Sequence, residues 1–211
     1  MKFIVAIDGT AASGKGTLGK KIAQHFNFNY LDTGILYRVV AYHLQSSFSF
    51  SKITKQKVQD SLKLLKNKNF KLTNLRNEII TLKASKISKN KIVRDNLLNY
   101  QREFALQNGG AVLDGRDIGT VVCPDADVKI FVDADIQIRA KRRYDQFFEN
   151  NKNLNLKNII NDLTKRDNLD KKRQFSPMVP AKDAFLLDTS NITVEEGVKK
   201  IISIISKKLE K

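Results

Sequence analysis

The sequence has few of the residues that build disulfides and metal clusters. Cys123 is the only cysteine in 211 residues, so the chain can form no internal disulfide and no cysteine-based metal site. The two histidines, His25 and His43, lie in helical patterns without a cysteine or carboxylate at metal-ligand spacing. We therefore interpret both histidines as packing or surface residues rather than as ligands.

Long apolar runs are also missing. No run approaches the ~18 consecutive apolar residues typical of a membrane-spanning helix. The start of the chain reaches Asp8 and Gly9 too soon for a signal peptide. The 41% of hydrophobic residues still suffices for a buried core, and the length favours one domain with an insert over two full domains. We expect a cytoplasmic protein with no membrane contact.

Acidic residues are scarce relative to basic ones. Lys and Arg together number 38 against 22 Asp and Glu, which gives a net charge of +16 at pH 7. This charge is compatible with nucleic acid, an acidic membrane surface or small polyanionic substrates. Lysine blocks with interleaved aromatic residues are absent, so we interpret the scattered lysines as a solvated coat. Only ten of the basic residues are arginines, and each is a candidate phosphate ligand because its planar fork grips phosphate with two bonds.

Short apolar runs alternate with helical patterns along the chain. The runs predict buried strands at residues 3–7, 28–31, 111–113, 128–132 and 185–187. A helix is predicted over Thr54–Leu65, and Thr193–Glu196 has the form of a capping box that opens a final amphipathic helix. Residues 66–91 show only weak alternation, around Ile79–Leu82 for example, and are predicted to form a small, loosely patterned insert. The alternation predicts an α/β fold with a doubly wound, mostly parallel sheet, whose ligands lie beyond the carboxyl ends of the strands.

A glycine-rich segment follows the first predicted strand and opens the first helix. Its context is that of a phosphate loop, because backbone N–H groups and a helix N-terminus together bind anions. Lys15 is expected to span the β- and γ-phosphates of a nucleoside triphosphate. The usual Ser or Thr after this lysine is replaced by Gly16, which leaves the direct Mg²⁺ ligand open. The predicted ATP-binding residues are Gly9, Thr10, Ala11, Ala12, Ser13, Gly14, Lys15, Gly16 and Thr17.

Several arginines follow predicted strands or lie in the charged stretch near residue 170. Phosphoryl transfer needs several cations around two facing anions, because its catalysis is chiefly positioning and charge stabilisation. A single arginine would be explained equally well by a surface ion pair, but five at such places favour a kinase site. They are Arg38, Arg94, Arg116, Arg166 and Arg173.

Six segments, in order along most of the chain, resemble bacterial cytidylate kinases. The most specific is the run Asp114-Gly115-Arg116-Asp117-Ile118-Gly119-Thr120, whereas the phosphate loop alone would suit many kinases. The others are Gly14-Lys15-Gly16-Thr17, Asp32-Thr33-Gly34 with Tyr37-Arg38, Pro124–Phe131, Arg139–Arg143 and Ser176–Ala181.

The resemblance implies a nucleoside monophosphate kinase of the P-loop type. Its core would comprise about residues 1–39 and 93–211, with a monophosphate-binding insert at about 40–92 and a helical lid at about 150–178. It implies ATP with Mg²⁺ and CMP or dCMP as substrates, no nucleic-acid partner and a monomeric state.

The resemblance also implies roles for individual residues. Positions matching Arg38 and Arg116 hold the acceptor phosphate, and those matching Ser85, Arg94 and Asp117 contact the cytosine ring. Arg166 and Arg173 match lid residues, and the Asp170 position lies near the ribose. The catalytic set is Lys15, Arg116, Arg166 and Arg173, and the CMP-binding set is Thr33, Tyr37, Arg38, Ser85, Arg94, Arg116, Asp117, Arg166, Asp170 and Arg173.

Other functions remain open from the residues themselves. A P-loop kinase for UMP, AMP or shikimate would share the loop and the sheet, but is not expected to combine Asp114–Thr120 with Ser85 and Arg94. A basic nucleic-acid-binding ATPase would use the positive charge directly and needs an extended basic groove. A GTPase-like switch is disfavoured because no Asn-Lys-x-Asp segment is present. The chain also departs from the usual Ile-Arg-Thr of the family, with Ile79-Ile80-Thr81.

Overall fold

The computed structural model of the chain describes residues 2–44, 53–67, 70–75, 77–148 and 155–210. These residues form two compact units. The first unit comprises Met1–Leu31 and Ala105–Lys211, and the second comprises Asp32–Phe104. Within the described ranges, no helix is both long enough and apolar enough to cross a membrane.

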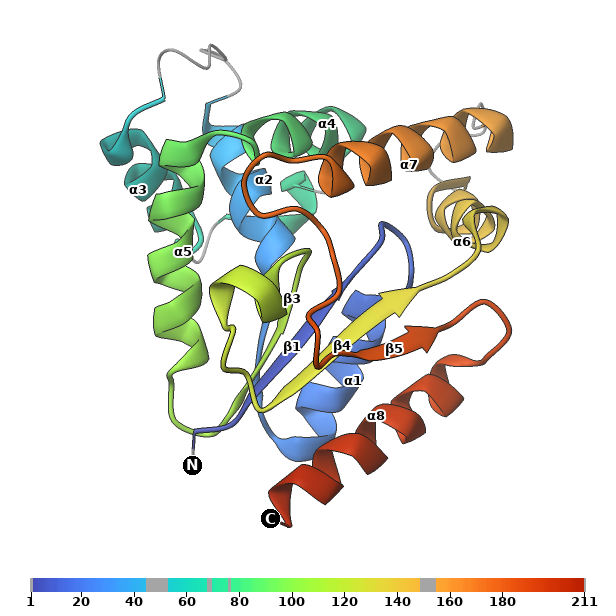
Figure 1. The fold of residues 1–211 in the computed structure, drawn as a ribbon. Helices are drawn as coiled ribbons and strands as arrows, with labels where there is room; N and C mark the ends of the chain where they lie inside the picture. The colour runs from blue at the N-terminus through green and yellow to red at the C-terminus, as the bar shows by residue number, and fades with distance from the viewer. Residues whose placement is uncertain (1, 45–52, 68–69, 76, 149–154, 211) are drawn as a thin grey trace. The chain divides into compact units, whose positions relative to one another are not determined.

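The first unit is built on a five-stranded sheet with the strand order β2-β3-β1-β4-β5 (Figure 1). The central strand β1 pairs in parallel with β3 and with β4, and β4 pairs in parallel with β5. All five predicted strands are confirmed within two residues at either end, and so is the parallel α/β class. The strands are β1 (Ile4–Gly9), β2 (Asn29–Asp32), β3 (Ala111–Asp114), β4 (Val128–Asp133) and β5 (Phe185–Asp188).

Two helices, α1 (Lys15–Phe26) and α8 (Val194–Leu209), cover one face of this sheet (Figure 1). Val5 and Ile7 alternate along β1 and both pack into the same buried cluster, because successive side chains of a strand point to opposite faces. The predicted capping box opens α8. The backbone N–H of Thr193 donates to the Glu196 carboxylate at 2.7 Å, and the N–H of Glu196 donates to the Thr193 hydroxyl at 3.2 Å.

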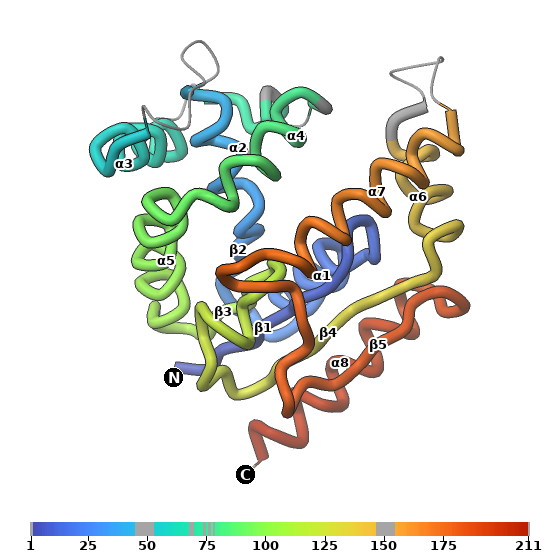
Figure 2. Tube along the Cα trace, turned by 45° about the horizontal axis from the view of Figure 1, so that its top comes forward, coloured from blue at the N-terminus to red at the C-terminus, as the bar shows by residue number. Residues whose placement is uncertain are grey.

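The described part of the first unit contains three further helical segments. A π-helix, Ile118–Val122, follows β3, and single π-turns of this kind are frequent at functional sites. Helix α6 (Ile136–Phe148) follows β4, and α7 (Leu156–Lys171) lies alongside it (Figure 2). Leu163 of α7 is buried against Ala140 of α6 and Ala11 of the predicted phosphate loop.

The second unit is helical where the structure describes it. Its α-helices in the described ranges are α2 (Thr33–His43), α3 (Lys55–Leu64), α4 (Glu78–Ile87) and α5 (Lys91–Ala105), and a short 3-10 helix spans Leu72–Leu75. Helix α2 packs against α3 and α4. The predicted helix over Thr54–Leu65 is confirmed as α3, which Thr54 caps by accepting the backbone N–H of Lys57.

The loose pattern predicted for residues 66–91 is wrong over α4. Asn77 caps this helix by accepting the backbone N–H of Ile80 at 2.8 Å. Ile80, Ala84 and Ile87 are buried at spacings of four and three residues, which is the helical period. The sequence hides this period because Ile79 and Leu82 are exposed at 65% and 54% and add apolar residues to the outer face.

Candidate active site

The predicted phosphate loop lies between β1 and α1 and begins with a glycine that no other residue can replace. A Cβ atom on Gly9 would lie 1.9 Å from the carbonyl oxygen of Val132 in β4, and the Gly9 φ is 147°. Inside the loop, Ala12 adopts a φ of 61°. This left-handed conformation costs a non-glycine residue roughly 1–2 kcal/mol, so neighbouring contacts must hold it.

Side chains from other strands fix the loop. The Thr10 hydroxyl donates to the Asp133 carboxylate at 2.6 Å, at the carboxyl end of β4. The Thr189 hydroxyl, directly after β5, donates to the Ser13 carbonyl at 2.9 Å. The Thr10 carbonyl accepts from the Ser13 hydroxyl at 3.0 Å and from the Lys15 ammonium group at 3.1 Å. The bonds from Thr189, Ser13 and Lys15 are accepted by loop carbonyls, whereas a phosphate group binds to N–H groups.

Helix α1 begins at Lys15, immediately after the loop. Gly14 precedes it with a φ of 89°, and among the described residues no side chain caps the helix. The first turn of a helix has N–H groups without an intrahelical acceptor and carries a positive partial charge. The start of α1 is therefore suited to bind a phosphate group.

The carboxyl end of β3 places an acidic residue beside this loop. A Cβ on Gly16 would lie 3.4 Å from Oδ2 of Asp114. The Tyr30 hydroxyl donates to the same carboxylate and also approaches the Gly16 carbonyl at 3.4 Å. In the described part of the chain no three His, Cys, Asp or Glu residues are grouped to hold a metal ion. A divalent cation that is held mainly by substrate phosphates needs only one or two protein carboxylates, and Asp114 could be such a ligand.

The Asp114–Thr120 run is held by a buried carboxylate at the end of β1. Asp8 accepts the backbone N–H groups of Ile118 at 2.7 Å and of Gly119 at 2.8 Å. Burial raises the pKa of Asp8 to about 7, although the two backbone N–H groups lower it. The charge of Asp117 also raises the Asp8 pKa, and the charge of Arg116 lowers it. Asp8 therefore anchors the backbone that carries two predicted site residues.

Asp170, near the end of α7, contacts Arg116 and also Arg173, which lies two residues after the helix. The Arg116 guanidinium donates to the Asp170 carboxylate at 2.9 Å, and Arg173 donates to the other oxygen of that carboxylate. Asp170 is only 2% exposed. Burial alone raises its pKa, but the charges of Arg116 and Arg173 outweigh burial and hold the Asp170 pKa below its ordinary value. The charge of Arg166 acts in the same direction.

In the second unit, two predicted base-contacting residues meet at Ser88. The Arg94 guanidinium donates to the Ser88 carbonyl at 3.2 Å, and the Ser88 hydroxyl donates to the Ser85 carbonyl at 2.8 Å. The Arg94 guanidinium also lies 5.9 Å from the ring centre of Tyr37, within cation–π distance. The start of α5 and the end of α4 are thus joined around Arg94.

The remaining predicted residues of the second unit lie on α2. Thr33 is its first residue and is buried. Arg38 lies one turn further along and pairs with the Asp32 carboxylate at 3.6 Å, while both side chains stay partly exposed. Because the pair is long and partly solvated, it leaves Arg38 able to exchange its partner for a phosphate.

Three residues with structural importance at the site, Asp8, Asp133 and Asp167, are not among the predicted residues, and Arg139 is predicted only as part of a family segment. A usable signal existed for the first two, because polar residues at the carboxyl ends of parallel strands are expected to face ligands. Arg139 and Asp167 lie on α6 and α7, and only the packing of these helices shows their pairing.

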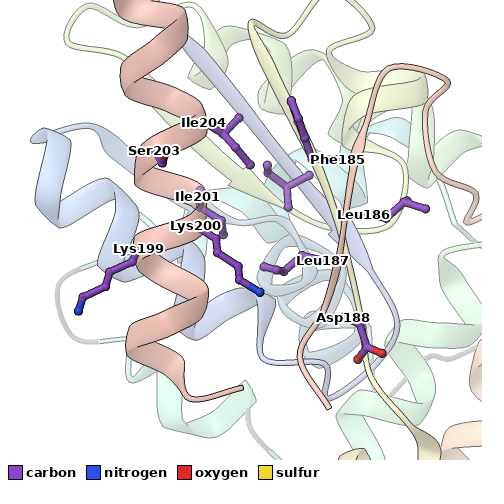
Figure 3. Close-up of a pocket in the computed structure, with 10 residues that line it drawn as sticks. Phe185, Leu186, Leu187, Asp188, Lys199, Lys200, Ile201, Ser203 and Ile204 are labelled. Atoms are coloured by element: carbon purple, nitrogen blue, oxygen red, sulfur yellow. The ribbon is translucent and has the colours of Figure 1, made fainter. Parts of the chain in front are cut away.

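A pocket of about 660 Å³ lies away from these residues, between β5 and α8 (Figure 3). Its walls are mainly apolar, with Lys199, Lys200 and Asp188 at its margin. Phe185 and Leu186 are 52% and 72% exposed on this edge strand. None of the predicted site residues lines the pocket, so it is separate from the candidate active site.

Comparison with known proteins agrees with the resemblance in the motifs. The sequence profile of the cytidylate kinase family matches residues 5–207. A cytidylate kinase from Bradyrhizobium diazoefficiens is 46% identical over 203 residues, which cover 96% of this chain and 95% of that protein.

Solved structures agree in the fold. An uncharacterized protein from Eubacterium ventriosum matches 97% of this chain and 98% of its own, with a TM-score of 0.59 and 15% identity. A gluconokinase from Sinorhizobium meliloti matches 98% of this chain and 93% of its own, with a TM-score of 0.52 and 10% identity. The profile and the sequence identity show that the chain belongs to the cytidylate kinase family.

Proposed function

We propose that the protein transfers the γ-phosphoryl group of ATP to CMP or dCMP, giving ADP and CDP or dCDP. Family membership supports the reaction. The observation that carries it is the contact of Arg116 and Arg173 with Asp170, in the same unit as the phosphate loop. This contact gathers cations from two distant segments, and positioned cations are what phosphoryl transfer requires.

On this proposal each part of the first unit has one task. The loop from Gly9 to Thr17 binds the phosphates of ATP, and Lys15 exchanges its contact with the Thr10 carbonyl for the β- and γ-phosphates. Arg116 holds the acceptor phosphate, and Arg166 and Arg173 offset the charge on the transferring group. No general base is needed, because the acceptor phosphate is already an anion.

The predicted CMP-binding residues of the second unit are proposed to bind the nucleoside monophosphate. Arg38 binds its phosphate, and Arg94 with Ser85 contacts the cytosine ring, next to Thr33 and Tyr37. Asp117 and Asp170 of the first unit contact the base and the ribose. The monophosphate-binding insert is proposed at about residues 40–92 and the lid at about 150–178. Residues 45–52, 68–69, 76 and 150–154 of these segments lie outside the described residues.

Mg²⁺ is the divalent ion proposed to accompany ATP. In kinase sites it is held by substrate phosphates, water and one or two protein oxygens, and when bound it neutralises charge on the phosphates. The Asp114 carboxylate beside Gly16 and the hydroxyl of Thr17, the next residue, are the oxygens suited to hold it. The protein is further proposed to act as a cytoplasmic monomer, without nucleic-acid or membrane partners.

One assay distinguishes the candidate functions. Purified protein is incubated with Mg²⁺ and ATP together with CMP, dCMP, UMP, AMP, shikimate or single-stranded DNA, and ADP release is measured. We expect turnover with CMP and dCMP to exceed that with every other addition by at least about 10²-fold, since a buried polar mismatch costs a few kcal/mol. Faster turnover with another acceptor, or ADP release stimulated by DNA, would refute the proposal.

A further inference from the structure

Asp167 lies on α7 but bonds to two other parts of the first unit. One carboxylate oxygen accepts the backbone N–H of Ala11 in the phosphate loop at 3.2 Å, and the other accepts Arg139 of α6 at 2.5 Å. Asp167 and Arg139 are each 6% exposed. A charge-assisted pair of this kind has a specific geometry. Because both groups are buried, loss of one partner leaves the other charge buried alone, which is strongly destabilising.

Arg139 completes the contact with the loop. Its guanidinium donates to the Ala11 carbonyl at 3.1 Å and to the Ala134 carbonyl, just after β4, at 2.8 Å. The N–H and the C=O of Ala11 are therefore both held, one by Asp167 and the other by Arg139. The next residue, Ala12, has the left-handed φ of 61°. The two contacts on Ala11 supply the restraint that this strained residue needs.

The same contact fixes the rotation of α7 about its own axis. Asp167 shares the buried side of α7 with Leu163 and Asp170, at spacings of four and three residues. With Asp167 bound to the loop, Asp170 is directed to Arg116, as observed at 2.9 Å. One side chain thus sets both the loop conformation and the direction of the predicted lid residues.

We propose that Asp167 is a positioning residue for the kinase reaction, which holds the phosphate loop in its ATP-binding conformation and aligns α7 with it. The inference rests on the proposed function, since it assigns ATP to the loop. Asp167 touches no reacting group on this proposal. It acts through Ala11 and, along its helix, through Asp170.

The test is the variant Asp167→Asn. Asparagine keeps the size and one acceptor oxygen but loses the charge that pairs with Arg139. Charge-assisted hydrogen bonds contribute about tenfold or more in affinity, so we expect the Kd for Mg²⁺-ATP, measured by calorimetry without CMP, to rise at least ~10-fold. The kcat with CMP should fall as well. A merely structural residue would lower the melting temperature and leave the ATP affinity of the folded protein unchanged.

Two further variants make the result decisive. Asp162→Asn removes an exposed carboxylate from the same helix and should leave the Kd and kcat unchanged. If Asp167→Asn does not fold, the double variant Asp167→Asn with Arg139→Gln removes both charges and is measured instead. A folded variant with wild-type ATP affinity overturns the inference, as does an equal loss in Asp162→Asn. If the wild-type protein itself fails to bind ATP or to phosphorylate CMP, the proposed function is what fails.

Discussion

The Asp170 carboxylate lies 2.9 Å from Nε of Arg116, although 54 residues separate them in the chain. Asp170 is buried, and it also contacts Arg173, which lies two residues after the end of α7. Burying a carboxylate is unfavourable unless cations offset it, and here arginines do so. Because the carboxylate already orients these guanidinium groups, they need little rearrangement when a phosphate arrives. Preorganised charge of this kind is a major source of transition-state stabilisation.

Substituting Arg166 should affect turnover more than CMP binding. Arg166 lies on α7 next to Asp167, and its proposed contacts form around the transferring phosphoryl group. We expect Arg166→Ala to lower kcat by about 10²-fold or more, with a KM for CMP within a few fold of wild type. Steady-state kinetics with varied CMP measure both constants. The exposed neighbour Lys165→Ala is the control. A raised KM with unchanged kcat would instead indicate a ground-state contact.

Removing the loop lysine should abolish phosphoryl transfer while the protein stays folded. The Lys15 ammonium group donates to the Thr10 carbonyl at 3.1 Å, and the residue is only partly buried, so truncating it should leave the core of the first unit intact. Loss of a phosphate-binding cation should cost on the order of 3–4 kcal/mol of transition-state stabilisation, a ~10²–10³-fold lower rate for Lys15→Ala. Lys21→Ala removes a solvated lysine of the same helix, paired with Glu195 at 3.6 Å, and should leave the rate unchanged. Normal turnover with a normal circular-dichroism spectrum in Lys15→Ala would contradict the ATP site.

The buried Asp8 should make stability fall as the pH rises towards neutrality. Its pKa is about 7 in the folded protein against an ordinary value of 3.8. Between these values the folded state holds a proton that the unfolded state has released, so the free energy of unfolding decreases with rising pH across this window. In Asp8→Asn this contribution is absent, and the variant should gain stability relative to wild type between pH 5 and pH 7. The window opens near the ordinary value of 3.8 and closes near pH 7, so both of these pH values lie within it.

Denaturant unfolding of both proteins at a series of pH values measures this difference. The exposed Asp125→Asn variant serves as the control and should follow the wild-type profile. Parallel profiles for wild type and Asp8→Asn would show that Asp8 does not hold a proton in the folded state. An additional, pH-independent loss in Asp8→Asn is expected, because its amide nitrogen would face one of the N–H groups of Ile118 and Gly119.

The parts of the fold that the sequence predicts best are those with local causes. Buried parallel strands are continuous apolar runs, as in Val5–Ile7. The first glycine of the phosphate loop lies at the end of such a strand, where the chain turns. The capping box at Thr193 is equally local. Residues predicted from the family motifs contact one another within each unit, as Arg116 does with Asp170 and Arg94 with Tyr37. Their roles in binding remain predictions.

The parts that sequence analysis missed depend on contacts between elements. Helix α4 is short, and its exposed Ile79 and Leu82 obscure the apolar period that the buried side of the helix follows. The pair of Arg139 and Asp167 is separated by 28 residues and exists only because α6 packs against α7. A single sequence contains no signal for such a pairing, because both residues also fit an exposed helix surface.

The choice of base should depend on the carboxylate of Asp117. Cytosine presents an acceptor at N3 and an amino donor at N4, which match an arginine donor and a carboxylate acceptor. Uracil reverses both positions, so its N3–H would face Arg94 and its O4 would face Asp117. Unpaired buried charged groups cost a few kcal/mol, which corresponds to a roughly 10²–10⁴-fold preference for CMP over UMP. Asp117 is buried at 6% exposure, so water cannot readily relieve the mismatch.

The variant Asp117→Asn separates base recognition from a purely structural role. Asparagine keeps the shape of the side chain, but its amide can donate a hydrogen bond to O4 of uracil. We therefore expect kcat/KM for CMP to fall by about 10²-fold while the ratio of CMP to UMP moves towards unity. Competing-substrate assays with both nucleotides measure the ratio directly, and Asp125→Asn, an exposed carboxylate, should leave it unchanged. A variant with lower activity but the wild-type ratio would show that the base is recognised by other residues, and that Asp117 only supports the backbone anchored by Asp8.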